Sequence, residues 1–225
     1  NKGYRGFFLD TMDSYRLAEK FSEEEQQAGL VRVIQKLNAQ FPGIKLILNR
    51  GFEIVPRVRD QIQMVAAESL FRGWDASNKR YIDISPKDRE WILGQLHSIR
   101  ERDKLPVLSI AYVPPHDREA MRDVVKKIEA LGIIPWVTDA DLRTQGMGTI
   151  EAQARRVLIL RNGAEVPALN LSAAHRFLEM PLNYMGYIAD YADIREPLPT
   201  DIDRDRYAGV VTWFNGAIPD RKIKE

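Results

Sequence analysis

Two carboxylates follow short apolar runs in the sequence, at positions where buried strands are expected to end. Asp10 comes directly after Phe7–Leu9, and Glu68 comes directly after Met64–Ala67. In a (β/α)8 barrel the catalytic side chains lie at the carboxyl ends of the strands, so both residues are candidates for acid–base or nucleophilic chemistry. Each also has a purely structural alternative, since a carboxylate in such a place can cap the segment that follows.

Further polar side chains lie at or just beyond expected strand ends. They are Asp13, Asn49, Asp139 and Asp141. The carboxyl ends of parallel strands meet at one edge of a sheet, so these residues are expected near the two candidate acids. Each is either a hydrogen-bond partner for a ligand or a cap for its own loop, and the residues alone leave both alternatives open.

The elements that would position these side chains alternate along residues 1–141. Apolar runs predict strands at Phe7–Leu9, Ile44–Asn49, Met64–Ala67, Val107–Val113 and Ile133–Thr138. Helices are predicted between most of them, with start signals at Ser22–Glu25 and at Ser85 and Pro86. A loop is expected between Gly73 and Tyr81. This alternation predicts an α/β fold with a parallel sheet covered by helices.

A second α/β segment is expected after Gly146–Gly148. The sequence predicts strands at Arg156–Leu160, Tyr187–Ile194 and Gly209–Phe214, with a helix at Ser172–Met185. We therefore predict two domains, residues 1–148 and residues 155–225, and we take the second to be the start of a further α/β domain.

Composition excludes several classes of site. The 225 residues are 44% hydrophobic and 29% charged, as in a globular protein with a substantial core. The net charge of +1 gives no electrostatic reason to expect nucleic acid as a partner. Without cysteine there are no disulfides or thiolate metal sites, and the three histidines form no metal-binding pattern, so no metal and no cofactor is expected. No apolar run is long enough for a membrane span.

Four motifs, in this order and separation, give the chain a resemblance to a known family. They are Gly6–Ser14, Leu48–Gly51, Ala67–Leu70 and Pro135–Asp139. The chain resembles the hydrolase domain of the bacterial Pel exopolysaccharide hydrolase/deacetylase family and, more distantly, the endo-α-1,4-polygalactosaminidase glycoside hydrolases. The resemblance implies a (β/α)8 TIM-barrel glycosidase domain, N-terminally truncated here, with the last five strands present. Residues 155–218 resemble the start of the middle domain of that family, which is flavodoxin/amidotransferase-like.

The resemblance implies that Asp10 and Glu68 are the catalytic pair. Counted along the chain, their strands are two apart, so inward-leaning side chains would bring the carboxylates to roughly 5–9 Å, the range that glycosidases use. We expect Asp10 to be the nucleophile or ion-stabilising carboxylate and Glu68 to be the acid. The sequence leaves open whether the reaction retains or inverts the anomeric configuration.

Substrate contacts are expected from residues around this pair. We predict hydrogen bonds from Asp13, Asn49, Asp139 and Asp141 and aromatic stacking from Trp74 and Tyr112. Together with Asp75, the carboxylates would give an acidic groove that attracts a cationic, partly deacetylated galactosamine polymer.

Two functions are compatible with these features. The leading hypothesis is an endo-acting hydrolase of an α-1,4-linked galactosamine or N-acetylgalactosamine exopolysaccharide. The alternative is a non-catalytic barrel that binds polysaccharide or scaffolds an exopolysaccharide biosynthesis assembly. By resemblance we expect a periplasmic or extracellular location, with other biosynthesis or export proteins as partners, although no signal peptide is recognisable in this stretch.

Overall fold

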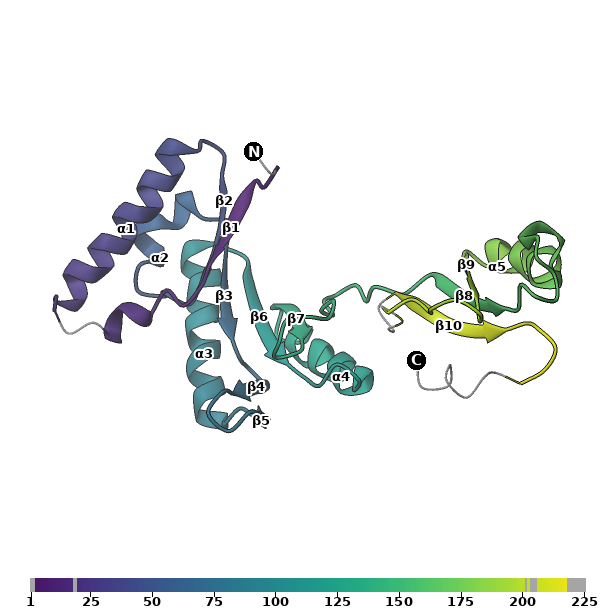
Figure 1. The fold of residues 1–225 in the computed structure, drawn as a ribbon. Coiled ribbons are helices and arrows are strands. Elements are labelled where there is room, and N and C mark those ends of the chain that lie inside the picture. The colour runs from purple at the N-terminus through teal and green to yellow at the C-terminus, as the bar shows by residue number, and fades with distance from the viewer. Residues whose placement is uncertain (1–2, 18–19, 201, 203–205, 218–225) are drawn as a thin grey trace. The chain divides into compact units, whose positions relative to one another are not determined.

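The computed structural model describes residues 3–17, 20–200, 202 and 206–217 (Figure 1). The chain forms two compact units, Asn1–Glu151 and Ala152–Glu225. Among the described residues, no helix combines the length and the apolar character needed to cross a membrane.

The first unit is built on a five-stranded parallel sheet. In spatial order its strands are β1 (Gly6–Leu9), β2 (Lys45–Asn49), β3 (Met64–Glu68), β6 (Val107–Tyr112) and β7 (Ile134–Thr138). Each pair of neighbours is parallel, so the predicted α/β fold with a parallel sheet is confirmed. All five strands present their carboxyl ends at one edge of the sheet.

Helices connect the strands, and their termini follow the signals in the sequence. They are α1 (Glu23–Gln40), α2 (Val55–Val58), α3 (Pro86–Ser98) and α4 (Arg118–Glu129). Ser22 and Glu25 form the predicted capping box, in which each satisfies a main-chain N–H of the other. Ser85 caps α3, with proline in the first turn. Local sequence therefore fixes where the two longest helices start.

The main core lies on one face of the sheet. On β2, Leu46 and Leu48 are fully buried within the core cluster, whereas Ile47, which points to the opposite face, is only partly buried. On that opposite face, Phe8 and Trp136 are 45% and 40% exposed. Successive side chains on a strand alternate between faces, so Asn49 belongs to the second, more open face. The polar groups at the strand ends of the central strands therefore project from the open face.

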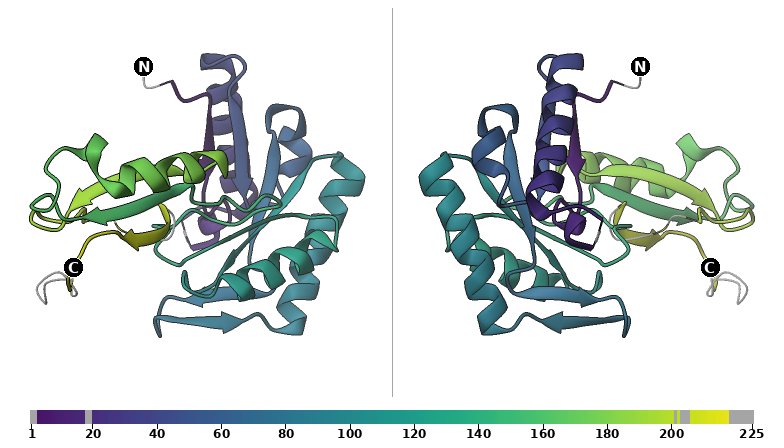
Figure 2. Two further views of the ribbon diagram at one scale, coloured as in Figure 1. Left: turned by 90° about the vertical axis from the view of Figure 1, so that its right-hand side faces the viewer. Right: turned by 90° about the vertical axis from the view of Figure 1, so that its left-hand side faces the viewer.

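A hairpin interrupts the alternation of strands and helices. Strands β4 (Arg72–Asp75) and β5 (Arg80–Asp83) pair antiparallel, with Trp74 opposite Tyr81, and form a separate two-stranded ribbon (Figures 1 and 2). The sequence predicted only a loop here, and that prediction was wrong. The two rings meet edge to face with centroids 4.9 Å apart, a cross-strand contact that stabilises the hairpin. The hairpin directly follows the end of β3.

Residues 146–148, at the end of the first predicted domain, are packed into the first unit. Val137 on β7 and Met147 exchange two main-chain hydrogen bonds of 2.8 and 2.7 Å. Met147 is 2% exposed and belongs to the core of the first unit. The first unit accordingly extends to Glu151, within the gap between the two predicted domains, and the Glu151 carboxylate pairs with Arg118 and Arg122 on α4.

The second unit contains a parallel three-stranded sheet in the order β10, β8, β9. The strands are β8 (Arg156–Arg161), β9 (Ile188–Asp193) and β10 (Tyr207–Thr212), with a π-helical segment His175–Glu179 and helix α5 (Met180–Tyr184) between the first two. One small core, around Ile159 and Leu182, lies on the helical face. A second core, around Leu158 and Tyr207, lies on the other face.

Candidate active site

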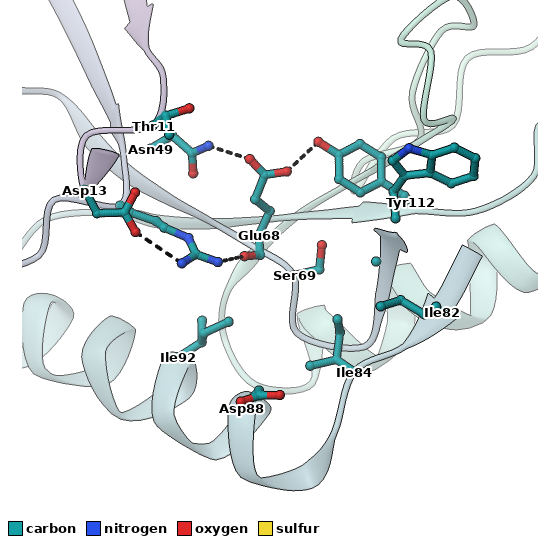
Figure 3. Close-up of a pocket in the computed structure, with 13 residues that line it drawn as sticks. Thr11, Asp13, Asn49, Glu68, Ser69, Ile82, Ile84, Asp88, Ile92 and Tyr112 are labelled. Carbon is teal, nitrogen blue, oxygen red and sulfur yellow. Dashed lines mark hydrogen bonds and ion pairs between the residues drawn. The ribbon is translucent and has the colours of Figure 1, made fainter. Parts of the chain in front are cut away.

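Three of the central strands end in side chains that point toward one another. Asn49 ends β2, Glu68 ends β3 and Tyr112 ends β6. Asp10 follows the last residue of β1, next to β2. Because the strands are parallel and in register, these four side chains from distant parts of the sequence gather at one edge of the sheet. Figure 3 shows three of them, Asn49, Glu68 and Tyr112.

Asn49 links the two predicted catalytic carboxylates. Its amide nitrogen donates one hydrogen bond to Asp10 Oδ1 at 2.7 Å and another to Glu68 Oε1 at 2.6 Å. The two N–H bonds of an amide diverge by about 120°, which places these carboxylate oxygens about 4–5 Å apart. Asn49 is only 2% exposed. The amide therefore holds the two carboxyl groups close together by giving each of them a donor.

Glu68 has a second partner on its other oxygen. The Tyr112 hydroxyl donates to Glu68 Oε2 at 2.5 Å (Figure 3). Burial raises the pKa of Tyr112 far above its usual value, and the hydrogen bond to Glu68 and the charges of Glu68 and Asp10 raise it further. Tyr112 consequently stays a protonated phenol throughout the physiological pH range. The sequence assigned it to stacking, whereas here its hydroxyl is directed at a carboxylate.

Asp10 is held by the loop that follows β1. The main-chain N–H of Thr11 donates to Asp10 Oδ1 at 2.8 Å, so this oxygen accepts two hydrogen bonds. The next residue, Met12, donates its N–H to the carbonyl oxygen of Asn49 at 3.0 Å, which ties the loop to β2. Asp10 itself is exposed, whereas Glu68 is partly buried.

Arg50 is a residue of this site that sequence reasoning missed. Its Nη2 donates to the main-chain oxygen of Glu68 at 2.7 Å, and its Nη1 pairs with Asp13 Oδ2 at 3.2 Å. Arg50 adopts a φ of 62°, in the left-handed region, directly after the end of β2. The signal that could have found it is a cationic side chain inside the motif Leu48–Gly51, among several carboxylates. Asp13 is thereby placed in the site, but as the partner of Arg50.

A cavity of about 480 Å³ opens beside these groups. One wall is polar and includes Asp13, Asn49 and Glu68. Another wall comes from the hairpin and α3 and is largely apolar, with Ile82 and Ile92 (Figure 3). Trp74 of the hairpin also lines the cavity. A cavity with a few converging polar groups and an apolar wall is the usual form of a small-ligand site.

Two of the predicted substrate-binding residues lie outside this lining. Asp139 is 5% exposed and accepts hydrogen bonds from the main-chain N–H groups of Arg143 and Thr144 and from the Thr144 hydroxyl. Burial acts to raise the pKa of Asp139, but the hydrogen bonds from Thr144 outweigh it and hold the pKa below its usual value. Asp141 is exposed on the same loop. These contacts match the loop-capping alternative for Asp139.

Asp75 also has a local function. It is the last residue of β4, where it accepts hydrogen bonds from Asn78 and Ser77 in the hairpin turn that lower its pKa. Around the cavity, the acidic side chains that contribute to the lining are Asp13, Glu68 and Asp88. In the described part of the chain, no three or more His, Asp or Glu side chains are placed to hold a metal ion.

Comparisons with known proteins agree with this arrangement. The family model described as glycoside-hydrolase family GH114 matches residues 1–156. The glycoside hydrolase domain of PelA from Pseudomonas aeruginosa is 36% identical, with a TM-score of 0.62. A variant of that domain, in which one glutamate is replaced by alanine, gives 35% and 0.62. Each match covers 66% of this chain and 58% of the other chain. No curated protein matches the sequence.

Proposed function

This chain belongs to glycoside-hydrolase family GH114, and from that premise we propose that it cleaves an α-1,4-linked galactosamine or N-acetylgalactosamine exopolysaccharide internally. Asp10 and Glu68 are the catalytic carboxylates in this proposal. The observation that carries it is the Asn49 amide, which donates to both carboxylates at 2.7 and 2.6 Å at the edge of a cavity. A binding-only barrel has no need to hold two carboxyl groups together, whereas glycoside hydrolysis needs such a pair.

The separation of the pair favours a double-displacement reaction. Retaining glycosidases hold their carboxyl groups about 5–5.5 Å apart, whereas inverting enzymes use about 6.5–9.5 Å to admit a water molecule. Asp10 Oδ1 and Glu68 Oε1 accept from the same amide nitrogen and are therefore about 4–5 Å apart. This separation matches the shorter one, that of the retaining enzymes. We accordingly propose retention of the anomeric configuration.

Hydrogen bonding distinguishes the roles of the two carboxylates. Asp10 Oδ1 accepts from two N–H groups, which can only donate, so these partners hold this oxygen as an acceptor, as a nucleophilic carboxylate requires. Glu68 Oε2 faces a hydroxyl, and a hydroxyl can accept as well as donate, so Glu68 can carry a proton there without losing that hydrogen bond. Asp10 is therefore the nucleophile and Glu68 the acid and base, the same roles that the sequence suggested.

The reaction then proceeds in two balanced steps. Glu68 gives its proton to the glycosidic oxygen while an oxygen of Asp10 attacks the anomeric carbon, so the leaving chain departs with a hydroxyl group. A water molecule next gives a proton to the Glu68 carboxylate and attacks the same carbon, which breaks the bond to Asp10. Both residues return to their starting protonation states.

Azide tests this assignment directly. With an activated aryl α-glycoside of a galactosamine oligosaccharide, Asp10→Ala plus azide should give the β-glycosyl azide, because azide replaces the nucleophile. Glu68→Ala plus azide should give the α-glycosyl azide, because azide attacks the covalent intermediate. NMR of the products reads the configuration. Wild-type turnover in either variant would remove that residue from the mechanism, and exchanged configurations would exchange the two roles.

We also propose that the five-stranded sheet is an arc of a (β/α)8 barrel. The sheet is all parallel, and one of its sides faces the core while Phe8 and Trp136 are half-exposed on the other. Both features agree with a sheet that forms part of a barrel wall. Further strands beside β1 would cover that strand's free edge and the open face. The proposed polymer is an extracellular material, so a periplasmic or extracellular location and exopolysaccharide biosynthesis partners belong to the same proposal.

A further inference from the structure

The second unit has a strand order that places ligand sites at a defined position. Its first strand, β8, lies between β9 and β10, and all three are parallel. The chain leaving β8 leads to β9, and the chain leaving β9 crosses to the other side of β8 to form β10. In open α/β sheets, ligands bind outside the carboxyl ends of the strands where the strand order reverses, which here is between β8 and β10.

A cavity of about 480 Å³ lies at this position. Its walls come from the segment after β8, including Asn162 and Glu165, from the residues around the end of β10, including Trp213 and Asn215, and from Ser172 before the helical segment. The volume is in the range that holds a monosaccharide or a similar small molecule. No element of the site described above contributes to it.

Hydrogen bonds join the walls of this cavity to each other. The Glu165 carboxylate accepts the main-chain N–H of Asn215 at 3.0 and 3.1 Å, which joins the segments that follow the two strands. Arg161 donates to the carbonyl oxygens of Val166 at 2.8 Å and Pro167 at 3.3 Å, which fixes the loop after β8. These contacts give the cavity a defined shape.

The chemistry of the lining selects for an amino sugar. Within the described part of the chain, the Glu165 carboxylate accepts hydrogen bonds from neutral donors of Asn162 and Asn215, so its charge is available to a ligand cation. Trp213 is 42% exposed and offers an aromatic face to a pyranose ring or an ammonium group. The Arg161 guanidinium, by contrast, is directed at carbonyl oxygens.

We propose that this cavity binds an amino-sugar unit with a free ammonium group, as a second glycan site on the chain. A charge-assisted hydrogen bond to Glu165, stacking on Trp213 and the amide of Asn162 would recognise such a unit together. The choice of a galactosamine polymer as the source of this unit rests on the proposed function. The site would then hold a deacetylated stretch of the polymer that the first unit cleaves.

The four tryptophans of the chain allow a direct test in the complete protein. Each gives one indole N–H signal in a ¹⁵N NMR spectrum, assigned by single substitutions. We expect methyl α-galactosaminide to shift the Trp213 signal in a saturable way and to leave the signal of Trp91 unchanged. Trp91 is a matched control because it is similarly exposed, at 48%, and lies on α3. Methyl N-acetyl-α-galactosaminide should bind at least about tenfold more weakly, since it lacks the cation.

A Glu165→Gln variant completes the test. It keeps the shape of the side chain, and we expect it to lower the affinity for the amine at least about tenfold. Without ligand, the other three indole signals should stay where they are in the wild-type spectrum. An unmoved Trp213 signal, or equal affinity for the amine and the N-acetyl sugar, overturns the proposal. Hydrolysis of the polymer by the wild-type chain is measured separately, so loss of one proposal is distinguishable from loss of the other.

Discussion

At the scale of single residues, the site depends on uncharged hydrogen-bond donors that offset the repulsion between two close carboxylates. Two ionised carboxylates about 4–5 Å apart repel each other. Asn49 offsets part of the repulsion because one amide nitrogen donates to both. Tyr112 adds a donor that is never ionised at working pH. Neither partner brings a charge, so the pair keeps the negative field that an oxocarbenium-like transition state requires.

Tyr112→Phe separates two roles for this side chain. Phenylalanine keeps an aromatic face for stacking but removes the hydrogen bond to Glu68. A hydrogen bond to a charged group contributes about 1.5–3 kcal/mol. We therefore expect kcat to fall about 10–100-fold while KM stays nearly constant, as measured by steady-state kinetics on the polymer. An unchanged kcat would restore the stacking role that the sequence suggested.

Arg50→Lys tests whether the planar fork of the guanidinium positions Glu68. Lysine keeps the charge but cannot bond the main-chain oxygen of Glu68 and Asp13 in the same geometry. We expect kcat to fall about tenfold with little change in KM. Arg59→Lys is the matched control, since Arg59 is exposed and, within the described ranges, its ion pair is with neighbouring Asp60. If both variants behave alike, Arg50 is not a positioning residue.

At the scale of elements, the end of β7 shows how a strand-end carboxylate serves its own loop. Asp139 accepts three hydrogen bonds from the Arg143–Thr144 segment, and Val137 pairs with Met147. The loop is thus folded back onto its strand. By contrast, the corresponding position on β3 is followed by the β4–β5 hairpin, which provides one wall of the cavity.

Asp139→Asn should lower stability without a direct effect on chemistry. The hydrogen bonds from Thr144 keep the folded-state pKa below 3.8, so the stabilisation is fully present above pH 3.8 and is lost as pH falls through the folded-state value. We expect the variant to unfold about 1–3 kcal/mol more easily at pH 7 and the difference to shrink near pH 3. Urea denaturation at both pH values measures this.

Asp141→Asn is the control for that experiment, because Asp141 is exposed on the same loop. It should match the wild-type chain at both pH values. A loss of polymer affinity in Asp139→Asn, without a loss of stability, would instead favour the substrate-binding role expected from the sequence.

At the scale of the whole molecule, the open face of the first sheet and the free edge of β1 determine solution behaviour. Phe7 and Phe8 are 53% and 45% exposed, and among the described strands β1 pairs only with β2. An exposed apolar edge strand favours pairing with another chain. If the sheet is an arc of a barrel, residues 1–225 should self-associate as concentration rises.

Light scattering coupled to size-exclusion chromatography measures that association. Phe8→Glu should reduce it, because a charge on the open face opposes contact between chains. Trp91→Glu, an exposed aromatic position on α3, should leave it unchanged. A monodisperse monomer that melts in one cooperative transition would contradict the arc and indicate a stable open sheet.

The sequence by itself determined the features that depend on near neighbours. Apolar runs and capping signals, such as Ser22 with Glu25, specified the alternating elements, because helix starts and buried strands depend on residues a few positions apart. The same runs placed Asn49 and Glu68 at strand ends. The motifs around them also predicted the family that the comparisons show.

Only the tertiary structure decided which of these polar residues meet. The hydrogen bonds that build the site join residues 39, 19 and 44 positions apart in the sequence. Their formation depends on strand order, register and the direction of each side chain, and none of these is set by local spacing. Asn49 therefore becomes a shared donor, Tyr112 a hydrogen-bond partner of Glu68 and Arg50 a link to Asp13, whereas Asp139, at an equivalent strand end, is used by its own loop.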